Sequence, residues 1–314
     1  MKKSIYIAAL VLMCSFTAMS QQMPMYGQYI FNSSVLNPAQ AGARGDNQAG
    51  ILGRYQWVGI DGAPNTQTAF ANLSLPHDIG FALGIYQDQA GPVREFTLQT
   101  DVAYSSRISQ DWYLSGGLRL VANSMSINLA DLDDIIGTSD PLLGMDHRSG
   151  LKFNMGAGLL AFTNKHFVGI SMPRAIKVHN TDNYTASRHF FIYGGSSFDI
   201  TREISLSPSG MFRKAAQAPM QLDINAIGSY ENMIDFGPMI RSNLARGVID
   251  AIGFVAGYHL NDNWYFGYMY EFPTNRISTA TKQSHEISLR YQWKSASSGI
   301  FRTPGFFLND RRGK

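Results

Sequence analysis

The chain has 314 residues, of which 45% are hydrophobic, 12% aromatic and only 16% charged, with 30 glycines and a single cysteine. This composition excludes a disordered, collagen-like or coiled-coil chain, and one cysteine excludes a disulfide-based scaffold. The formal net charge is +3, and two of its positive charges, Lys2 and Lys3, would leave with a leader peptide. The remaining charge gives no basic field that would indicate nucleic acid as a partner.

The N-terminus has the pattern of a secretory signal. Lys2 and Lys3 precede an apolar stretch that ends near Phe16, and small residues follow it up to Ser20. The stretch is too short to cross a bilayer as a helix, which needs about 20 apolar residues. The cysteine lies inside the apolar stretch, so lipid attachment is not predicted. We predict a signal peptide at residues 1–20 and Sec-dependent export.

Residues 21–47 come next and show no regular alternation of apolar and polar positions. They are rich in Asn, Gln, Gly and Ala, and Tyr26, Tyr29 and Phe31 are large side chains suited to anchoring the segment. We therefore expect this region to be separate from the strands that follow it.

From residue 48 onward, apolar and polar side chains alternate with a period of two. Around residue 100 the apolar residues take mostly even positions and the polar residues mostly odd ones, and the pattern recurs near residues 222–230 and 286–293. We predict fourteen strands, at residues 48–58, 66–75, 78–87, 93–107, 111–126, 149–163, 166–175, 186–201, 203–213, 218–230, 232–242, 247–260, 263–273 and 283–294.

The strands and their links predict an all-β fold, a transmembrane antiparallel β-barrel of about 14 strands over residues 48–294 in the outer membrane. Tight turns, such as Ser109–Asp111, alternate with longer links, such as Asp88–Pro92 and Ile127–Arg148, as periplasmic turns and outer loops do. An even number of strands places both ends of the barrel domain on the periplasmic side. A soluble β-sandwich or propeller is the alternative, but its strands usually have about five or six residues. No apolar run is long enough for a membrane-spanning helix.

Several motifs resemble one protein family. The sequence QYIFNSSVLNPAQAG at residues 28–42, which includes Asn37 and Pro38, and RYQWVGIDGAPNTQ at residues 54–67 are similar to the opening signature of the PorP/SprF family. APMQLDINA at 218–226 and SHEISLRY at 284–291 resemble its C-terminal half. That family comprises membrane components of the type IX secretion system of Bacteroidetes.

The resemblance implies a non-enzymatic outer-membrane barrel without a cofactor, which works with type IX secretion machine subunits. Family members support the export or surface attachment of large adhesins, some of them in gliding motility, that carry a type B C-terminal sorting domain. Outer-membrane lipid and such a secreted adhesin are the implied partners. Inside such a barrel, residues 21–47 would form either a plug or a segment at the periplasmic mouth.

The motif at residues 54–67 also has a physical interpretation. Arg54 and Gln56 share one face of the first predicted strand, and Tyr55 and Trp57 share the other. If the aromatic residues face lipid, Arg54 points into the lumen, where it can pair with an acidic side chain. The candidate partners are Asp101, Glu286 and Asp223. The motif then contains four turn-forming residues, which predict an outer loop, and these are Gly59, Asp61, Gly62 and Pro64.

We consider two roles for this motif, a lumenal ion-pair network that stabilises the barrel and a direct grip on the sorting domain of a substrate. The site residues named for either role are Arg54, Gln56, Trp57, Gly59, Asp61, Gly62, Pro64, Asn37 and Pro38.

Residues 295–314 form a basic and aromatic tail. It contains four cationic and three aromatic side chains, namely Arg302, Arg311, Arg312, Lys314, Phe301, Phe306 and Phe307. Either the tail docks a periplasmic partner or it is loose.

Catalytic and metal signals are weak. Five aspartates between Asp131 and Asp146 offer oxygen ligands, but the stretch lacks the spacing and the glycine of an EF-hand loop. Gly156, Gly158 and Ala161 fit a dinucleotide-binding pattern, yet no helix is predicted after them. Two functions therefore stay open, a secretion or anchoring barrel that binds proteins and, as the alternative, an outer-membrane channel or transporter for a small or hydrophobic solute.

Overall fold

Long antiparallel strands make up most of the molecule. The computed structural model describes residues 26–29, 31–43, 45–128, 147–176, 188–215, 218–281 and 283–295. The long strands are β1 (Asp46–Tyr55), β2 (Asn65–Ser74), β3 (Ile79–Ala90), β4 (Val93–Arg107), β5 (Tyr113–Ile127), β7 (Lys152–Phe162), β8 (His166–Arg174), β9 (His189–Ser196), β11 (Ile204–Ala215), β12 (Gln221–Tyr230), β13 (Ile234–Asn243), β14 (Val248–His259), β15 (Trp264–Pro273) and β16 (Ser284–Lys294).

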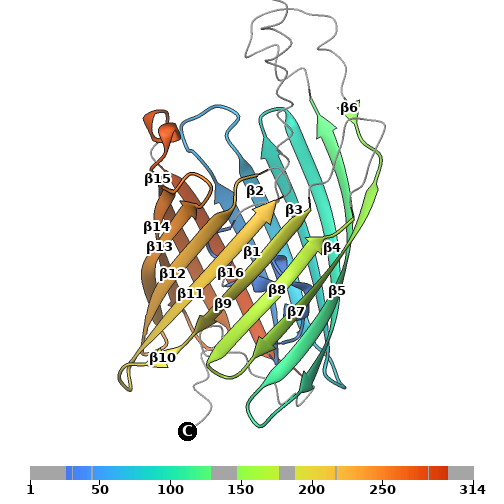
Figure 1. The fold of residues 1–314 in the computed structure, drawn as a ribbon, viewed down its shortest axis with the longest axis vertical. Coiled ribbons are helices and arrows are strands. Elements are labelled where there is room, and N and C mark those ends of the chain that lie inside the picture. Colours follow the sequence, from blue (N-terminus) through green and yellow to red (C-terminus); the bar gives the residue numbers. More distant parts are fainter. Residues whose placement is uncertain are drawn as a thin grey trace, which may run out of the picture.

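These strands close into a barrel. Each one pairs with its neighbour in sequence, and β1 pairs with β16 along its whole length, from Asp46 opposite Lys294 to Tyr55 opposite His285 (Figure 1). The two short strands β6 (His147–Arg148) and β10 (Phe198–Asp199) pair with β5 and β11. The predicted antiparallel barrel of fourteen strands is confirmed.

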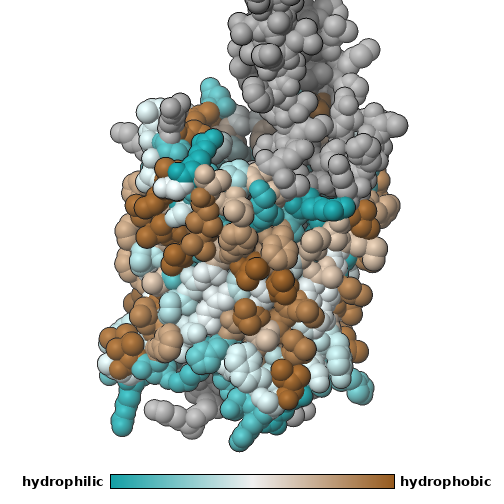
Figure 2. Space-filling model, viewed as in Figure 1, coloured by the Kyte–Doolittle hydropathy of each residue, from teal (hydrophilic) through white to brown (hydrophobic). Residues whose placement is uncertain are grey.

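The barrel has polar residues inside and apolar residues outside, as the period of two predicts. On β4 and β5, Val102 and Leu118 are 52% and 64% exposed on the outer wall, whereas Asp101 and Arg119 point inward and are 0% and 1% exposed. Figure 2 shows apolar residues spread over the middle of the outer wall and hydrophilic residues along its lower rim. This distribution suits a wall that faces lipid.

The two ends of the barrel differ in their connections. One end, which we name the turn end, carries short links such as residues 75–78, 163–165 and 231–233; the opposite loop end carries residues 56–64 and 274–283. The loop end also has the 3-10 helix η3 (Arg276–Thr279). The C-terminal end of β16 leads out at the turn end (Figure 1).

Several observed strand boundaries differ from the predicted ones: β1 begins at Asp46, the predicted strand 186–201 is β9 followed by β10, and β12 begins at Gln221. Two further differences change the interpretation of the motif and of the turns. The first strand ends at Tyr55, so Gln56 and Trp57 lie in the following loop. The prediction that Gln56 shares a strand face with Arg54, and Trp57 with Tyr55, is therefore wrong. The predicted long link at Asp88–Pro92 is wrong, because β3 continues to Ala90, which pairs with Val93. Only two residues remain in that turn, and Gly91 makes it possible with a positive φ of 56°.

Aromatic side chains gather near the strand ends on the outer wall of β15 and β16. Trp264 and Tyr291 lie with their ring centroids 4.9 Å apart near the turn end, and Tyr270 and Phe272 lie 4.5 Å apart near the loop end. These positions are typical of the aromatic girdles at the two membrane interfaces.

Some of the predicted segments lie outside the described residues. They are the signal peptide at 1–20, the aspartate-rich stretch Asp131–Asp146 and the tail from residue 296 onward. Within the part of the chain that is described, no helix is both long and apolar enough to cross a membrane.

Candidate functional site

The lumen is filled by residues 26–43, which we name the lumenal segment. All its described side chains are buried, and the chain forms two short 3-10 helices, η1 (Ser33–Val35) and η2 (Pro38–Gln40). Tyr29, Phe31 and Leu36 belong to one apolar cluster with residues from the inner wall. The molecule's core therefore lies between this segment and the barrel wall, rather than between two sheets.

The N-terminal part of the segment is held by side chains of β16. The carboxylate of Glu286 accepts hydrogen bonds from the backbone N–H groups of Gly27 and Gln28, at 2.6 and 2.9 Å. Ser288 donates to the side-chain oxygen of Gln28 at 2.9 Å, and Arg290 donates to the carbonyl of Phe31 at 3.2 Å. One strand thus satisfies several backbone groups that the segment would otherwise bury without partners.

Arg119 on β5 holds the middle of the segment. Its guanidinium donates to the carbonyls of Ser34 and Val35, the latter at 2.7 Å. It also bonds both carboxylate oxygens of Asp101 on β4, at 2.6 and 2.7 Å. Because Asp101 and Arg119 are opposite each other in the β4–β5 register, the sheet itself brings the pair together.

Asn37 and Pro38 form the start of η2, where the segment touches the wall. The Asn37 side-chain oxygen accepts from the Ala39 N–H at 2.9 Å, and its amide nitrogen donates to the carbonyl of Leu159 at 2.9 Å and, more weakly, to that of Ile170 at 3.4 Å. Asn37 therefore caps η2 and also attaches it to β7 and β8.

Glycines in the wall make this approach possible. A Cβ at Gly117 on β5 would lie 2.6 Å from the carbonyl oxygen of Pro38 and closer still to Ala39, and a Cβ at Gly158 on β7 would overlap the Asn37 side chain. Gly156 and Gly158, which fit a nucleotide-binding pattern in the sequence, are thus strand residues of β7. Gly158 leaves room for the segment, and Gly156 lies against the backbone of Pro173 on β8.

Arg54 lies in a buried network of charges on the loop-end side of the lumen. Its guanidinium pairs with Glu286 on β16 and, at 3.0 Å, with Glu271 on β15. Glu271 also pairs with Arg241 at 2.8 Å, and Arg241 pairs with Asp223 at 3.1 Å. Arg213 extends the network, 3.6 Å from Asp223. Three cations and three carboxylates alternate, so each charge is compensated in the low-dielectric interior.

Of the three partners predicted for Arg54, the structure places only Glu286 beside it. Asp101 pairs with Arg119, and Asp223 pairs with Arg241 and Arg213. The sequence did not predict Glu271 as a partner of Arg54, or Arg241 as a member of the network. The register carries a usable signal, since Arg54 is opposite Glu286 and Asp223 is opposite Arg241.

The rest of the motif at residues 54–67 begins with the loop between β1 and β2. The Gln56 N–H donates to the Pro64 carbonyl at 2.9 Å, and the Trp57 N–H donates to the Ser284 hydroxyl at 3.1 Å. Gly59 and Gly62 have positive φ angles, and the Gly62 carbonyl accepts from Gly91 in the β3–β4 turn at 2.8 Å.

This loop is thereby attached to β16 and to the β3–β4 turn, with Asp61 exposed to solvent at the loop end. The named site residues divide between two places: Arg54, Asn37 and Pro38 lie in the lumen, and the others lie in this loop. No group of His, Cys, Asp or Glu side chains that could hold a metal ion occurs among the described residues.

Comparisons with known proteins agree with this architecture. A family model described as type IX secretion system membrane protein PorP/SprF matches residues 18–291. No curated protein matches the chain.

Solved structures with a similar fold are outer-membrane barrels. The Ralstonia pickettii toluene transporter TbuX has 10% identity and a TM-score of 0.50, over 84% of this chain and 94% of that one. The CymD monoaromatic hydrocarbon channel has 10% identity and a TM-score of 0.49, over 89% and 95%. The NanC porin has 9% identity and a TM-score of 0.43, over 78% and 100%. At such identities the likeness to TbuX extends to the fold alone.

Proposed function

Because the chain belongs to the PorP/SprF family of type IX secretion system membrane proteins, we propose that it is a closed, non-enzymatic scaffold that supports the export or surface attachment of large adhesins. It is an integral barrel of the outer membrane. The proposed partners are the secretion machine subunits and an adhesin that carries a type B C-terminal sorting domain.

The filled lumen is the observation that carries the scaffold proposal. The lumenal segment contacts strands on all sides of the barrel, including β2 through Asn72, β9 through Tyr193 and β12 through Asn225. A segment that is hydrogen-bonded to strands around the whole circumference acts as a plug and restrains the barrel wall around it. A rigid, plugged barrel suits the binding of a protein at its ends better than the passage of a solute.

We further propose that the loop end faces the outside of the cell and the turn end faces the periplasm. The longer loops at one end support this orientation, since barrels of this type keep short turns on the periplasmic side. Asp61→Cys in the β1–β2 loop should then react with an impermeant maleimide on intact cells, whereas Asn232→Cys in the β12–β13 turn should react only after lysis. The opposite labelling pattern would reverse the proposed orientation.

The central test is co-purification. The full chain, tagged at the C-terminus, is extracted from outer membranes in mild detergent, and bound proteins are identified by mass spectrometry. We expect large surface proteins with a C-terminal sorting domain, or periplasmic machine subunits. A barrel that purifies without them and conducts ions in a planar bilayer would overturn the scaffold proposal.

The alternative function is a channel or transporter for a small or hydrophobic solute. The fold similarity to TbuX, a toluene transporter, is the observation in its favour. Uptake of such a solute by vesicles that contain the purified chain, above that of vesicles without protein, would support this alternative.

A further inference from the structure

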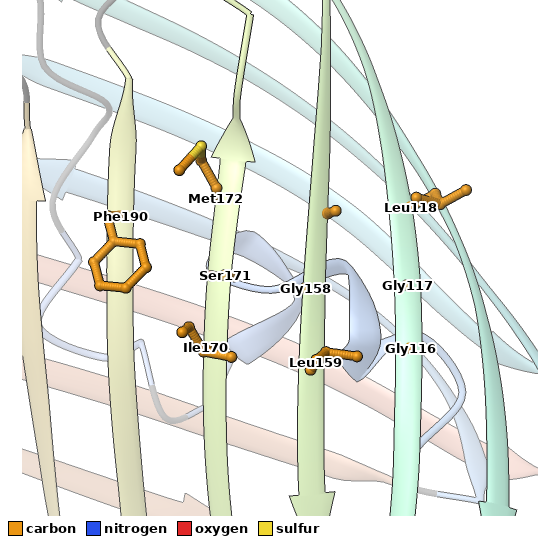
Figure 3. A pocket seen from close by; sticks show the side chains of 10 residues that line it. Gly116, Gly117, Leu118, Gly158, Leu159, Ile170, Ser171, Met172 and Phe190 are labelled. Carbon is orange, nitrogen blue, oxygen red and sulfur yellow. The ribbon is translucent and has the colours of Figure 1, made fainter.

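The outer wall has an apolar hollow of about 430 Å³ across β5, β7, β8 and β9. The side chains around it are those of Leu118, Leu159, Ile170, Met172 and Phe190, which project from four adjacent strands (Figure 3). The polar residue in its lining, Ser171, has its hydroxyl turned inward, where it donates to the carbonyl of Leu36. The hollow therefore presents hydrocarbon to whatever lies outside it.

Strand register explains why the wall is hollow here. In one outward-facing row, Ala157 stands between Leu118 on β5 and Met172 on β8. In the next row, Gly116 stands beside Leu159. The two small residues thus occupy neighbouring rows, and a Cβ added at Gly116 would meet only Leu159, at an ordinary contact distance of 3.6 Å. Missing side chains on β5 and β7 thus leave part of the space, and on its other side the pairing of β8 with β9 is irregular between Ser171 and Arg174.

The hollow is continuous with the surface that faces lipid. Leu118, Leu159 and Ile170 are 64%, 53% and 42% exposed, as other residues of the outer apolar belt are. Empty apolar volume at a surface immersed in lipid is unfavourable, because its lining loses dispersion contacts. The occupant that the surroundings supply is a hydrocarbon chain.

We propose that this hollow, the β5–β9 groove, binds one acyl chain of an outer-membrane lipid at a defined position. The groove lies directly outside the site where η2 meets the wall. Leu159 and Ile170 contribute their side chains to the groove and their carbonyls to the bonds from Asn37. An acyl chain in the groove therefore packs on the same residues that attach the lumenal segment, and its binding stabilises the plugged barrel.

Photocrosslinking tests the proposal. The full chain is reconstituted in phosphatidylethanolamine vesicles that contain a small fraction of the same lipid with a diazirine on one acyl chain, and labelled peptides are identified by mass spectrometry. We expect labelling of residues 116–118, 157–159 and 170–172 to exceed that of the opposite outer wall on β14 by several-fold. Labelling spread evenly over the outer wall would overturn the proposal.

Variants that fill the groove sharpen the test. Ala157→Leu should lower the local labelling several-fold and should abolish any rise in thermal unfolding temperature caused by added lipid. Ala256→Leu is the matched control, because Ala256 is an outward-facing alanine between Phe236 and Tyr268 on the other side of the barrel. If Ala157→Leu does not assemble, Gly116→Ala places a single methyl group in the groove instead. Local labelling that stays unchanged in the variant that assembles would contradict the groove.

Discussion

The two ends of the lumenal segment are attached to the wall in different ways. Residues 26–31 are held by charged and hydroxyl side chains that reach inward from β16, including Glu286, Ser288 and Arg290. Residues 37–40 approach the backbone of β5 and β7 directly, at glycines. The first attachment rests on hydrogen bonds and charge, and the second on the absence of side chains. Disrupting each should therefore have a different consequence.

The largest effect is expected from a side chain placed where η2 meets the wall. Gly117→Val would overlap the backbone of Pro38 and Ala39, and neither backbone can move without leaving the wall. We expect most of the variant to fail assembly and the assembled fraction to conduct ions in planar bilayers and to be cleaved by protease within the lumenal segment.

Gly210→Val is the matched control for that variant. Gly210 on β11 faces outward, where a Cβ would meet only the carbonyl oxygen of Asp223, at an ordinary distance of 3.8 Å. The Gly210→Val protein should assemble and remain closed. A Gly117→Val protein that is as closed and protease-resistant as the unchanged chain would show that the contact at η2 does not hold the segment.

The next largest effect is expected in the charge network. Glu286→Gln leaves Arg54 with Glu271 as its carboxylate partner and removes the charge that the Gly27 and Gln28 N–H groups bond. Removing one partner of a buried ion pair costs about 3–5 kcal/mol. The measurement is the free energy of unfolding by urea in lipid vesicles.

Glu203→Gln provides the comparison, because Glu203 is exposed at the turn end and its change should stay within about 0.5 kcal/mol. A second variant, Arg54→Met with Glu286→Met, tests the pairing itself. Its loss of stability should be smaller than the sum of the two single losses. Additive losses would mean that the two side chains act independently.

A smaller effect is expected at the cap of η2. Asn37→Ala removes the acceptor for the Ala39 N–H and the donor to Leu159, which leaves buried backbone groups unpaired at a cost of about 1–3 kcal/mol. Asn275→Ala is a close control, because Asn275 caps η3 through the same kind of bond to Ile277 but is exposed. Equal shifts of the two variants in thermal unfolding would refute a special role for the buried cap.

The smallest effect is expected at the N-terminal end of the segment. Tyr26→Phe removes one hydroxyl, which bonds the Thr68 hydroxyl at 2.5 Å, and the net value of such a bond is about 0.5–1.5 kcal/mol. Tyr230→Phe, at a position 48% exposed, should change the unfolding free energy less. A Tyr26→Phe variant as stable as the unchanged chain would mean that this end is held by the bonds from β16 and not by Thr68.

The barrel could be predicted from the sequence because every strand obeys one local rule. Alternation along β4 fixes which residues face lipid, and the predicted bounds 93–107 are those of the structure. The rule fails where the chain leaves the strand. Trp57 takes a positive φ of 49° just beyond β1, and Gly91 allows a turn shorter than its neighbouring residues indicate.

The candidate site was harder to predict from the sequence, because its contacts join distant parts of the chain. Alternation predicts that Arg54 faces the lumen, but the choice between Glu286, Asp101 and Asp223 depends on which strands are adjacent. Gly117 gave no signal and Gly158 entered only a nucleotide-binding pattern, since what requires them is the lumenal segment, through the Pro38–Ala39 backbone at Gly117 and the Asn37 side chain at Gly158. Each of these glycines is required by a residue that is close in space but distant in sequence, and the sequence alone does not show that contact.

The closing seam of the barrel also bears on biogenesis. The segment that occupies the centre is synthesised before every strand, whereas β16, which binds residues 27–31, is synthesised after all the others. Glu286 bonds the segment and Arg54 of β1 at once. The last strand therefore meets the first strand and the segment at the same residue, so that closing the β1–β16 seam and seating the segment depend on one side chain.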